Sequence, residues 1–186
     1  MLLLVGLGNP TPNSNNNRHN VGFKIVDAIN QKFGLSKQKP KFKGLLTTGT
    51  IGDKKIYAIK PLTFMNNSGI CIRELLEYFK MDAEDVIVFH DDLDVEFGKI
   101  KAKFGGSSAG HNGIASIDKF IGKDYSRVRI GIGKPENKIS VSDYVLNDFS
   151  DDEQEHLEKI TSNIIDSLSI LIDKKLDLSS STVNNN

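Results

Sequence analysis

Several polar side chains of the types that hydrolases use stand where apolar or glycine-rich runs end: Asn9, His19, Asn66, Asp91, His111 and Asn112. A histidine can accept a proton from water near neutral pH, and a carboxylate on its other ring nitrogen fixes the tautomer and stabilises the imidazolium that forms. Carboxamides donate and accept hydrogen bonds, so they suit an amide-bearing substrate or a developing oxyanion. These residue types favour hydrolysis with a histidine as general base, and Asp91 is the candidate for its carboxylate.

Other interpretations of the same residues stay open. His19 could simply begin a helix, His111 could serve the turn after Gly110, and runs of aspartate are commonly turn or cap residues. A metal site is the sharper alternative, because imidazole and carboxylate groups are metal ligands. Its candidate ligands are His90, Asp91, Asp92, Asp94 and His111, although the sequence has no HExxH motif and no cysteine pair.

The elements that must position these side chains begin with two wholly apolar runs, residues 2–5 and 86–89, which are typical of strands buried on both faces. Each run ends in polar residues, where open α/β sheets bind ligands. Further strands are expected over 45–51 and 55–60 as a hairpin, and over 99–104 and 127–132 from their alternation of basic and apolar residues. Helical spacing marks residues 20–33, 70–79, 114–121 and 157–171, the last after a capping box at 150–153.

This order of elements predicts one α/β domain over residues 1–177, with a mixed, mostly parallel twisted sheet flanked by helices. The length of 186 residues suits one domain with a substantial core. Residues 178–186 are rich in Ser and Asn and are expected to be a disordered tail. There is no secretory signal and no apolar run of transmembrane length, and the single cysteine, Cys71, fits a reducing compartment, so we expect a cytoplasmic protein with no membrane association.

The charges are unevenly distributed along the chain although the formal net charge is zero. Residues 98–138 hold nine Lys/Arg and three Asp/Glu, and residues 37–60 hold seven Lys and one Asp. Residues 150–177 reverse the balance, with eight Asp/Glu and three Lys. A basic face beside an acidic helix is the electrostatic footprint of a polyanion ligand, and a solvated mixture of charges is the plainer alternative.

Six motifs, in this order, resemble those of bacterial peptidyl-tRNA hydrolases. They are VGLGNP (5–10), RHNVGF (18–23), KPLTFMNNSG (60–69), HDDLD (90–94), GGSSAGHNG (105–113) and RVRIGIGKP (127–135). The resemblance covers nearly the whole chain. It implies a single α/β domain that cleaves the ester between a peptide and the 3′ end of tRNA, recycling tRNA from peptidyl-tRNA that stalled ribosomes release. It implies no metal and no organic cofactor.

Carried over residue by residue, the resemblance makes His19 the catalytic base, Asp91 its orienting carboxylate and Asn9 the residue that recognises the peptide side. The further contacts that it implies with the substrate are Ser14, Phe64, Met65, Asn66, His111 and Asn112. The basic patch that grips tRNA phosphates maps to Lys101, Lys103 and Arg129, in agreement with the charge count. The expected partner is peptidyl-tRNA, bound by its acceptor stem and 3′ end, and the expected state is a monomer.

The chain departs from the family pattern in two places. Ser14 stands where the family usually has a tyrosine, and the glycine-rich loop GGSSAG is poorer in glycine than usual. Two further classes of function compete with hydrolysis. An RNA-binding module would not need the set His19, Asp91 and Asn9, and a nucleotide site at VGLGNP would need a phosphate loop that opens a helix, which Pro10 and the long polar loop oppose.

Overall fold

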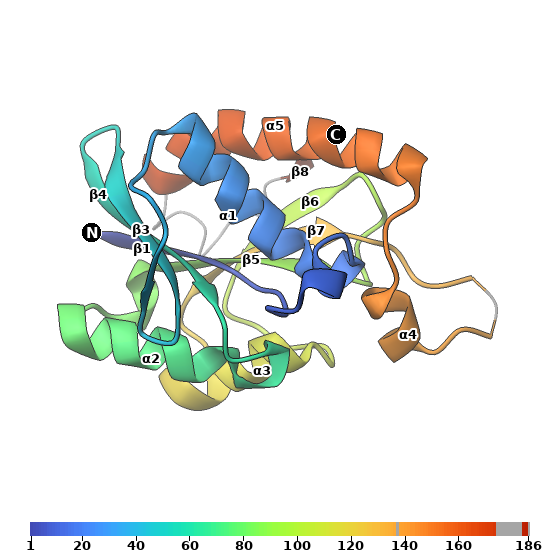
Figure 1. Ribbon diagram of the computed structural model, residues 1–186, viewed down its shortest axis with the longest axis horizontal. Coiled ribbons are helices and arrows are strands. Elements are labelled where there is room, and N and C mark those ends of the chain that lie inside the picture. The colour runs from blue at the N-terminus through green and yellow to red at the C-terminus, as the bar shows by residue number, and fades with distance from the viewer. Residues whose placement is uncertain (137, 174–183, 186) are drawn as a thin grey trace.

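The computed structural model describes residues 1–136, 138–173 and 184–185, and within them it contains one mixed sheet of eight strands (Figure 1). The order across the sheet is β2-β3-β4-β1-β5-β7-β6-β8. The strands are β1 (Leu2–Gly6), β2 (Lys39–Lys41), β3 (Gly44–Ile51), β4 (Lys54–Pro61), β5 (Val86–Asp92), β6 (Ile100–Phe104), β7 (Ser126–Gly131) and β8 (Asn184–Asn185). This confirms the α/β class and the single domain.

Five α-helices and four 3₁₀ turns in the described part of the chain connect these strands. The helices are α1 (Val21–Lys32), α2 (Ser68–Phe79), α3 (Asn112–Ile121), α4 (Val141–Leu146) and α5 (Asp151–Asp173), and the turns are η1 (Pro12–Ser14), η2 (Arg18–Asn20), η3 (Met65–Asn67) and η4 (Ala83–Asp85). Helices α1 and α5 cover one face of the sheet, and α2 and α3 cover the other, as Figure 1 shows. Two apolar cores therefore lie on either side of the sheet.

Strand β1 stands at the centre because its apolar run supplies side chains to both cores. Leu2 and Leu4 point to the core under α1 and α5, and Leu3 and Val5 point to the core over α2 and α3. The strand pairs in parallel with β4 on one side and with β5 on the other, and β5 pairs in parallel with β7. The carboxyl ends of these four strands meet at one edge of the sheet, where the sequence analysis expected the polar residues.

A close approach of backbone to backbone brings the start of α1 to this edge. A Cβ atom at Gly22 would clash with the carbonyl oxygen of Phe89 and lie 2.5 Å from the amide nitrogen of Leu7. Only glycine allows that approach, since any side chain would push α1 off β1 and β5. Because η2 precedes α1 directly, Gly22 fixes how near His19 comes to the end of β5.

Several local predictions can be compared with the structure. The β3–β4 hairpin and the capping box are confirmed, the latter by Ser150 and Glu153, whose side chains accept hydrogen bonds from each other's backbone N–H groups at 3.2 and 3.0 Å. Edge strand β2, in the lysine-rich segment 37–43, and helix α4 were not predicted. Of the predicted tail, residues 178–183 and 186 lie outside the described residues, as does the boundary at 177, and Asn184–Asn185 pair with β6. No described helix is long and apolar enough to cross a membrane.

Candidate active site

A cleft of about 630 Å³ opens at the carboxyl edge of the central strands. Its walls come from the turns that follow β1, β4 and β5, from the glycine-rich loop before α3, and from α4. The predicted residues that line it are Asn9, His19, Phe64, Met65, Asn66, Asp91, His111 and Asn112. Segments far apart in the sequence thus contribute to one cavity, as the six motifs led us to expect.

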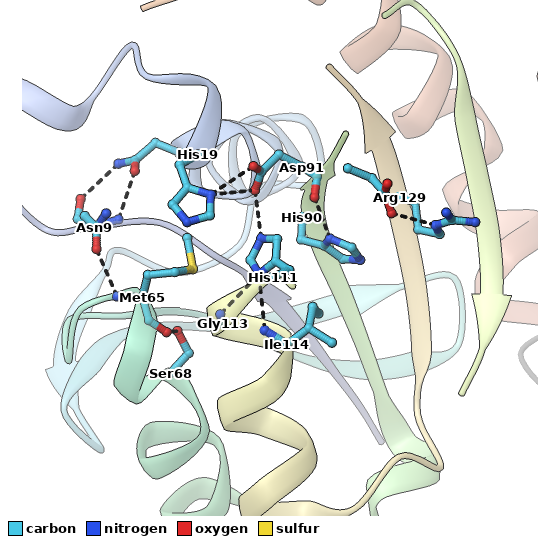
Figure 2. Close-up of polar contacts among 12 residues, drawn as sticks. Asn9, His19, Met65, Ser68, His90, Asp91, His111, Gly113, Ile114 and Arg129 are labelled. Atoms are coloured by element: carbon cyan, nitrogen blue, oxygen red, sulfur yellow. Dashed lines mark hydrogen bonds and ion pairs between the residues drawn. The ribbon is translucent and has the colours of Figure 1, made fainter. Parts of the chain in front are cut away.

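His19 and Asp91 form a direct contact on the cleft wall (Figure 2). The Nδ1 atom of His19 lies 2.9 and 3.0 Å from the two carboxylate oxygens of Asp91. The Asp91 side chain is 2% exposed and the His19 side chain 11%. Because a carboxylate only accepts hydrogen bonds, Nδ1 carries the proton and donates it to Asp91. The Nε2 atom of His19 then keeps its lone pair.

His111 is a second histidine on the same carboxylate, which sequence reasoning did not foresee. Its Nε2 atom lies 2.9 Å from Oδ1 of Asp91 (Figure 2). At the start of α3 its Nδ1 atom accepts hydrogen bonds from the backbone N–H groups of Gly113 at 3.1 Å and Ile114 at 3.2 Å. Since Nδ1 is an acceptor, the ring proton sits on Nε2 and is donated to Asp91. His111 therefore caps the helix, as its position after Gly110 indicated, and also holds Asp91.

The ionisation of Asp91 follows from this arrangement. Burial raises the pKa of the carboxyl, but the imidazole groups of His111 and His19 outweigh it by charge and hydrogen bonding and hold the pKa well below its ordinary range. The group is consequently a carboxylate throughout the pH range in which a histidine base operates. It can stabilise positive charge on the His19 ring without taking up the proton itself.

Asn9 presents a hydrogen-bond donor to the cleft. Its Oδ1 atom accepts from the backbone N–H of Met65 at 2.9 Å, which identifies the other amide atom as Nδ2. Asn20 brackets the Asn9 backbone, accepting from its N–H and donating to its C=O, both at 2.9 Å. Asn9 is thus held on both sides while its Nδ2 group makes no hydrogen bond to the described residues. That group is free to donate to a carbonyl oxygen of a substrate.

The turn after β4 forms the floor and rim of the cleft. Met65 is buried in the α2–α3 core and also lines the cleft. Phe64 has a φ of 64° and is 53% exposed, and a bulky residue in the left-handed region is strained. The strain turns an apolar ring outward on the cleft rim, which is a costly placement for a residue without a binding role.

Ser14 lies away from the cleft lining. It is 8% exposed in η1, and its hydroxyl pairs with that of Thr11 at 2.5 Å. A substrate contact at Ser14 therefore has no support from the geometry. Cys71 is a packing residue, because it is buried in α2 and burial raises the pKa of its thiol to about 12.

The predicted basic patch lies on β6 and β7. Lys101 is in register with Arg129, so both project from the same face, and Lys103 is two residues further along β6 on that face. Arg129 donates from Nε to Asp92 at 2.8 Å, which links the patch to the cleft lining. Arg127 shares the alternation but is 2% exposed and paired with Asp118 at 3.0 Å, so it does not extend the patch.

His90 lies behind the site rather than in it. It is 4% exposed, its Nδ1 donates to the backbone carbonyl of Asp91 at 2.8 Å, and its ring meets that of His111 edge-on at 5.0 Å between centroids. Its Nε2 atom is buried and has no hydrogen-bond partner among the described residues. Burial, together with the neighbouring His111, lowers the pKa of His90 to about 3, so the ring is neutral.

The metal interpretation can be judged from the hydrogen bonds. His19, Asp91 and His111 each offer a ligand atom, and these atoms lie within 4.8 Å of one another. To bind a cation through Nε2, however, His111 would have to move its proton to Nδ1, where two backbone N–H groups already donate. The other proposed ligands are engaged elsewhere: His90 with a backbone carbonyl, Asp92 with Arg129, and Asp94 with Lys134 at 3.4 Å. The donor set therefore fits a hydrogen-bonded histidine pair better than a metal ion.

One wall of the cleft was missed in the sequence analysis. Helix α4 contributes Val141, Ser142, Val145 and Leu146 to the lining. A signal for this helix is present, because Ser140 accepts a hydrogen bond from the N–H of Asp143 at 3.1 Å in the manner of an N-cap. The helix is difficult to predict from the sequence because a segment of six residues is too short to show a helical period.

Comparison with known proteins gives matches along the whole chain. The model of the family described as peptidyl-tRNA hydrolase matches residues 3–186. The peptidyl-tRNA hydrolase of Pelagibacter ubique (strain HTCC1062) is 82% identical over 185 residues, which cover 100% of both chains. That of Bacillus subtilis (strain 168) is 45% identical over 86% of this chain and 85% of the relative. The crystal structure of peptidyl-tRNA hydrolase from Acinetobacter baumannii superposes with a TM-score of 0.89 at 34% identity, covering 95% and 90% of the two chains.

Proposed function

The chain belongs to the peptidyl-tRNA hydrolase family and hydrolyses peptidyl-tRNA, and we propose that His19 is the general base of that reaction. The observation that carries the proposal is the hydrogen bond from His19 Nδ1 to Asp91, which leaves the lone pair of Nε2 at the cleft. His19 takes a proton from water, and the oxygen attacks the ester carbonyl of the peptide's C-terminal residue. Asp91 stabilises the imidazolium that forms.

The tetrahedral intermediate then needs a hydrogen-bond donor and a proton source. The Nδ2 group of Asn9 is a held donor on the cleft wall, and carboxamides at Asn66 and Asn112 line the same cavity. Donors fixed in advance stabilise a developing oxyanion without reorganisation. The protonated His19 returns its proton to the 3′ ribose oxygen as the carbon–oxygen bond breaks, which releases the peptide acid and tRNA.

Asn9 also supports discrimination between blocked and free amino groups. Its Nδ2 donates to a peptide carbonyl, which an N-blocked aminoacyl group carries next to its nitrogen. A free ammonium group offers only donors and would leave Nδ2 without an acceptor. We therefore expect aminoacyl-tRNA with a free amine to be a poor substrate.

The tRNA body approaches along β6 and β7 in this proposal. Lys101 and Lys103 project from β6 without a carboxylate partner within 4 Å among the described residues, and they suit the phosphates of the acceptor stem. Arg129 contributes from β7 beside Lys101. A substrate that stalled ribosomes release supports work in the cytoplasm, and a monomer stays the expected state.

The experiment compares release of the acyl group from N-acetyl-aminoacyl-tRNA and from free-amine aminoacyl-tRNA, with EDTA present. We expect selective cleavage of the N-acetyl substrate, and a loss of about 10²–10⁴ in rate for His19→Ala. Near-normal turnover by His19→Ala would show that the base is another group. Cleavage abolished by EDTA alone would return the His19, Asp91 and His111 set to the metal interpretation, and tRNA binding without cleavage would indicate a binding module.

A further inference from the structure

Arg18, the residue directly before His19, contacts the ends of α4 and α5, and α4 forms one wall of the cleft. Its Nη1 atom donates to the backbone carbonyls of Tyr144 at 3.2 Å and Asn147 at 3.3 Å, and its Nη2 atom lies 3.1 Å from Oε1 of Glu153. The two carbonyls belong to the last turn and the C-cap of α4, and Glu153 lies in the first turn of α5. One guanidinium thus joins the turn that carries His19 to the two helices beyond it.

Further contacts also join the η2 turn to α4 and to the segment that follows α4. The Arg18 guanidinium lies 4.2 Å from the centroid of the Tyr144 ring, within the range of a cation–π contact. The backbone N–H of Arg18 donates to Asn147 at 3.1 Å, and that of Phe149 donates to Asn16 at 3.1 Å. The segment after α4 is therefore tied to the η2 turn by backbone and side chain together.

Stability alone explains this arrangement poorly. The Arg18 side chain is 12% exposed, and its Nε atom is buried without a hydrogen-bond partner in the described part of the chain. Removing a cation from water costs free energy that its ion pair with Glu153 returns only in part. A buried and incompletely paired guanidinium beside an active site indicates that its geometry is needed.

Helix α4 needs contacts with other parts of the chain to be stable. It has six residues, too few to be stable by itself, and its last carbonyls have no partners within the helix. Its Val141 and Leu146 residues are 51% and 46% exposed and line the same cleft as His19. Arg18 supplies positive charge and N–H donors at the end of the helix where they are favourable.

We propose that Arg18 is a positioning residue that fixes the α4 wall relative to His19 and thereby shapes the part of the cleft that receives the acyl group. The inference rests on the proposed function, because it assigns the α4 side of the same cleft to the acyl group. Arg18 touches no reacting atom. Its loss widens or loosens the apolar wall, so binding of the acyl group weakens while the chemistry at His19 persists.

The experiment compares Arg18→Met and Arg18→Lys with Arg73→Met as a matched control. Arg73 also pairs with a glutamate, at 3.4 Å from Glu77, and also lies near an aromatic ring, at 5.3 Å from Phe120, but it stands on α2 outside the cleft lining. All variants are assayed for kcat and KM with N-acetyl-leucyl-tRNA and N-acetyl-glycyl-tRNA. Binding of deacylated tRNA and hydrogen exchange of the 141–147 amides are measured in parallel.

For Arg18→Met we expect KM for the leucyl substrate to rise about tenfold, the factor of one charge-assisted hydrogen bond, with kcat within about twofold. The glycyl substrate should be affected less, Arg18→Lys should recover part of the loss, and binding of deacylated tRNA should match that of Arg73→Met. Amide exchange in α4 should quicken in Arg18→Met alone. An unchanged KM, a loss confined to kcat, or unaltered exchange in α4 would each overturn the proposal. Absence of cleavage by the unmodified protein would overturn the proposed function, and the exchange experiment would still decide the role of Arg18.

Discussion

The replacement Asp91→Asn gives the sharpest expectation from the hydrogen-bond directions. In the native site Asp91 accepts from Nδ1–H of His19 and from Nε2–H of His111. An asparagine side chain accepts with its oxygen and donates with its NH₂ group, so an NH₂ donor replaces one of the two carboxylate oxygens that Nδ1 of His19 contacts. His111 cannot change, because its Nδ1 atom accepts from Gly113 and Ile114. The asparagine oxygen therefore faces His111, and its NH₂ group faces His19.

His19 then has to switch tautomer. Its Nδ1 becomes an acceptor and the proton moves to Nε2, the atom that should take a proton from water. The analogous change in a serine protease triad, where an aspartate becomes an asparagine, lowers kcat by about 10⁴-fold, which corresponds to about 5 kcal/mol of activation free energy. We expect a loss of the same order in kcat here, with KM little changed.

A second substitution, added to Asp91→Asn, tests whether the tautomer of His19 causes the loss of activity. His111→Asn keeps a residue type that caps helices well, but the shorter side chain cannot reach position 91. The double variant therefore lacks the donor that holds the amide oxygen of the asparagine at position 91. In the double variant the amide can rotate and present its oxygen to His19, which restores the productive tautomer. Single-turnover release of N-acetyl-aminoacyl groups should be about tenfold or more faster in the double variant than in Asp91→Asn. A double variant no faster than the single one would refute the tautomer argument.

Three further expectations follow from other parts of the structure. Lys101→Gln and Lys103→Gln should each raise KM, leave kcat unchanged and reduce the slope of log affinity against log salt by about 1, as measured by tRNA binding over a salt series. The pKa of His90 is about 3 in the folded protein and has its ordinary value in the unfolded chain. At a pH between these two pKa values the unfolded state binds one more proton than the folded state. The protein therefore loses stability as the pH falls through this range. Between pH 6.5 and 5, denaturant unfolding should show that the free energy of unfolding falls by about 2 kcal/mol less in His90→Phe than in the unmodified protein. Gly22→Ala should lower the unfolding free energy by about 3 kcal/mol in the same assay, because its methyl group meets the backbone of Phe89 and Leu7.

The parts of the fold that sequence reasoning predicted are those with strong local patterns. The apolar runs at 2–5 and 86–89 are typical of strands buried on both faces, and in parallel strands their polar ends are expected to meet at one edge. Helix α5 combines a capping box with five apolar residues at helical spacing, and it formed as predicted. Strand β2 has no such pattern, because the alternation of Lys and Pro reflects the protection of an exposed edge rather than a buried face.

The predicted catalytic and substrate-contacting residues line the cleft, apart from Ser14, but most of the connections among them were not predicted. Asn9, His19 and Asp91 each lie within one of the six motifs, so their presence at one cleft could be anticipated. Arg127 and Arg129 are two residues apart on one strand, yet one is buried against Asp118 and the other lines the way to the cleft. Alternation along a strand gives the face of a side chain, but the loop that folds over that face decides its burial.

The position of the ring proton on His19 is set by backbone N–H groups of α3, which act on it through His111 and Asp91. The first turn of α3 leaves backbone N–H groups without partners inside the helix, and those of Gly113 and Ile114 point at Nδ1 of His111. They force the His111 proton onto Nε2, that proton occupies one oxygen of Asp91, and the remaining acceptor sites of the carboxylate receive Nδ1–H of His19. The direction of a helix axis therefore sets the tautomer of the base. No pattern of residue types encodes that relation, because a histidine at an N-cap and a histidine in a cleft look alike in sequence until the carboxylate between them is located.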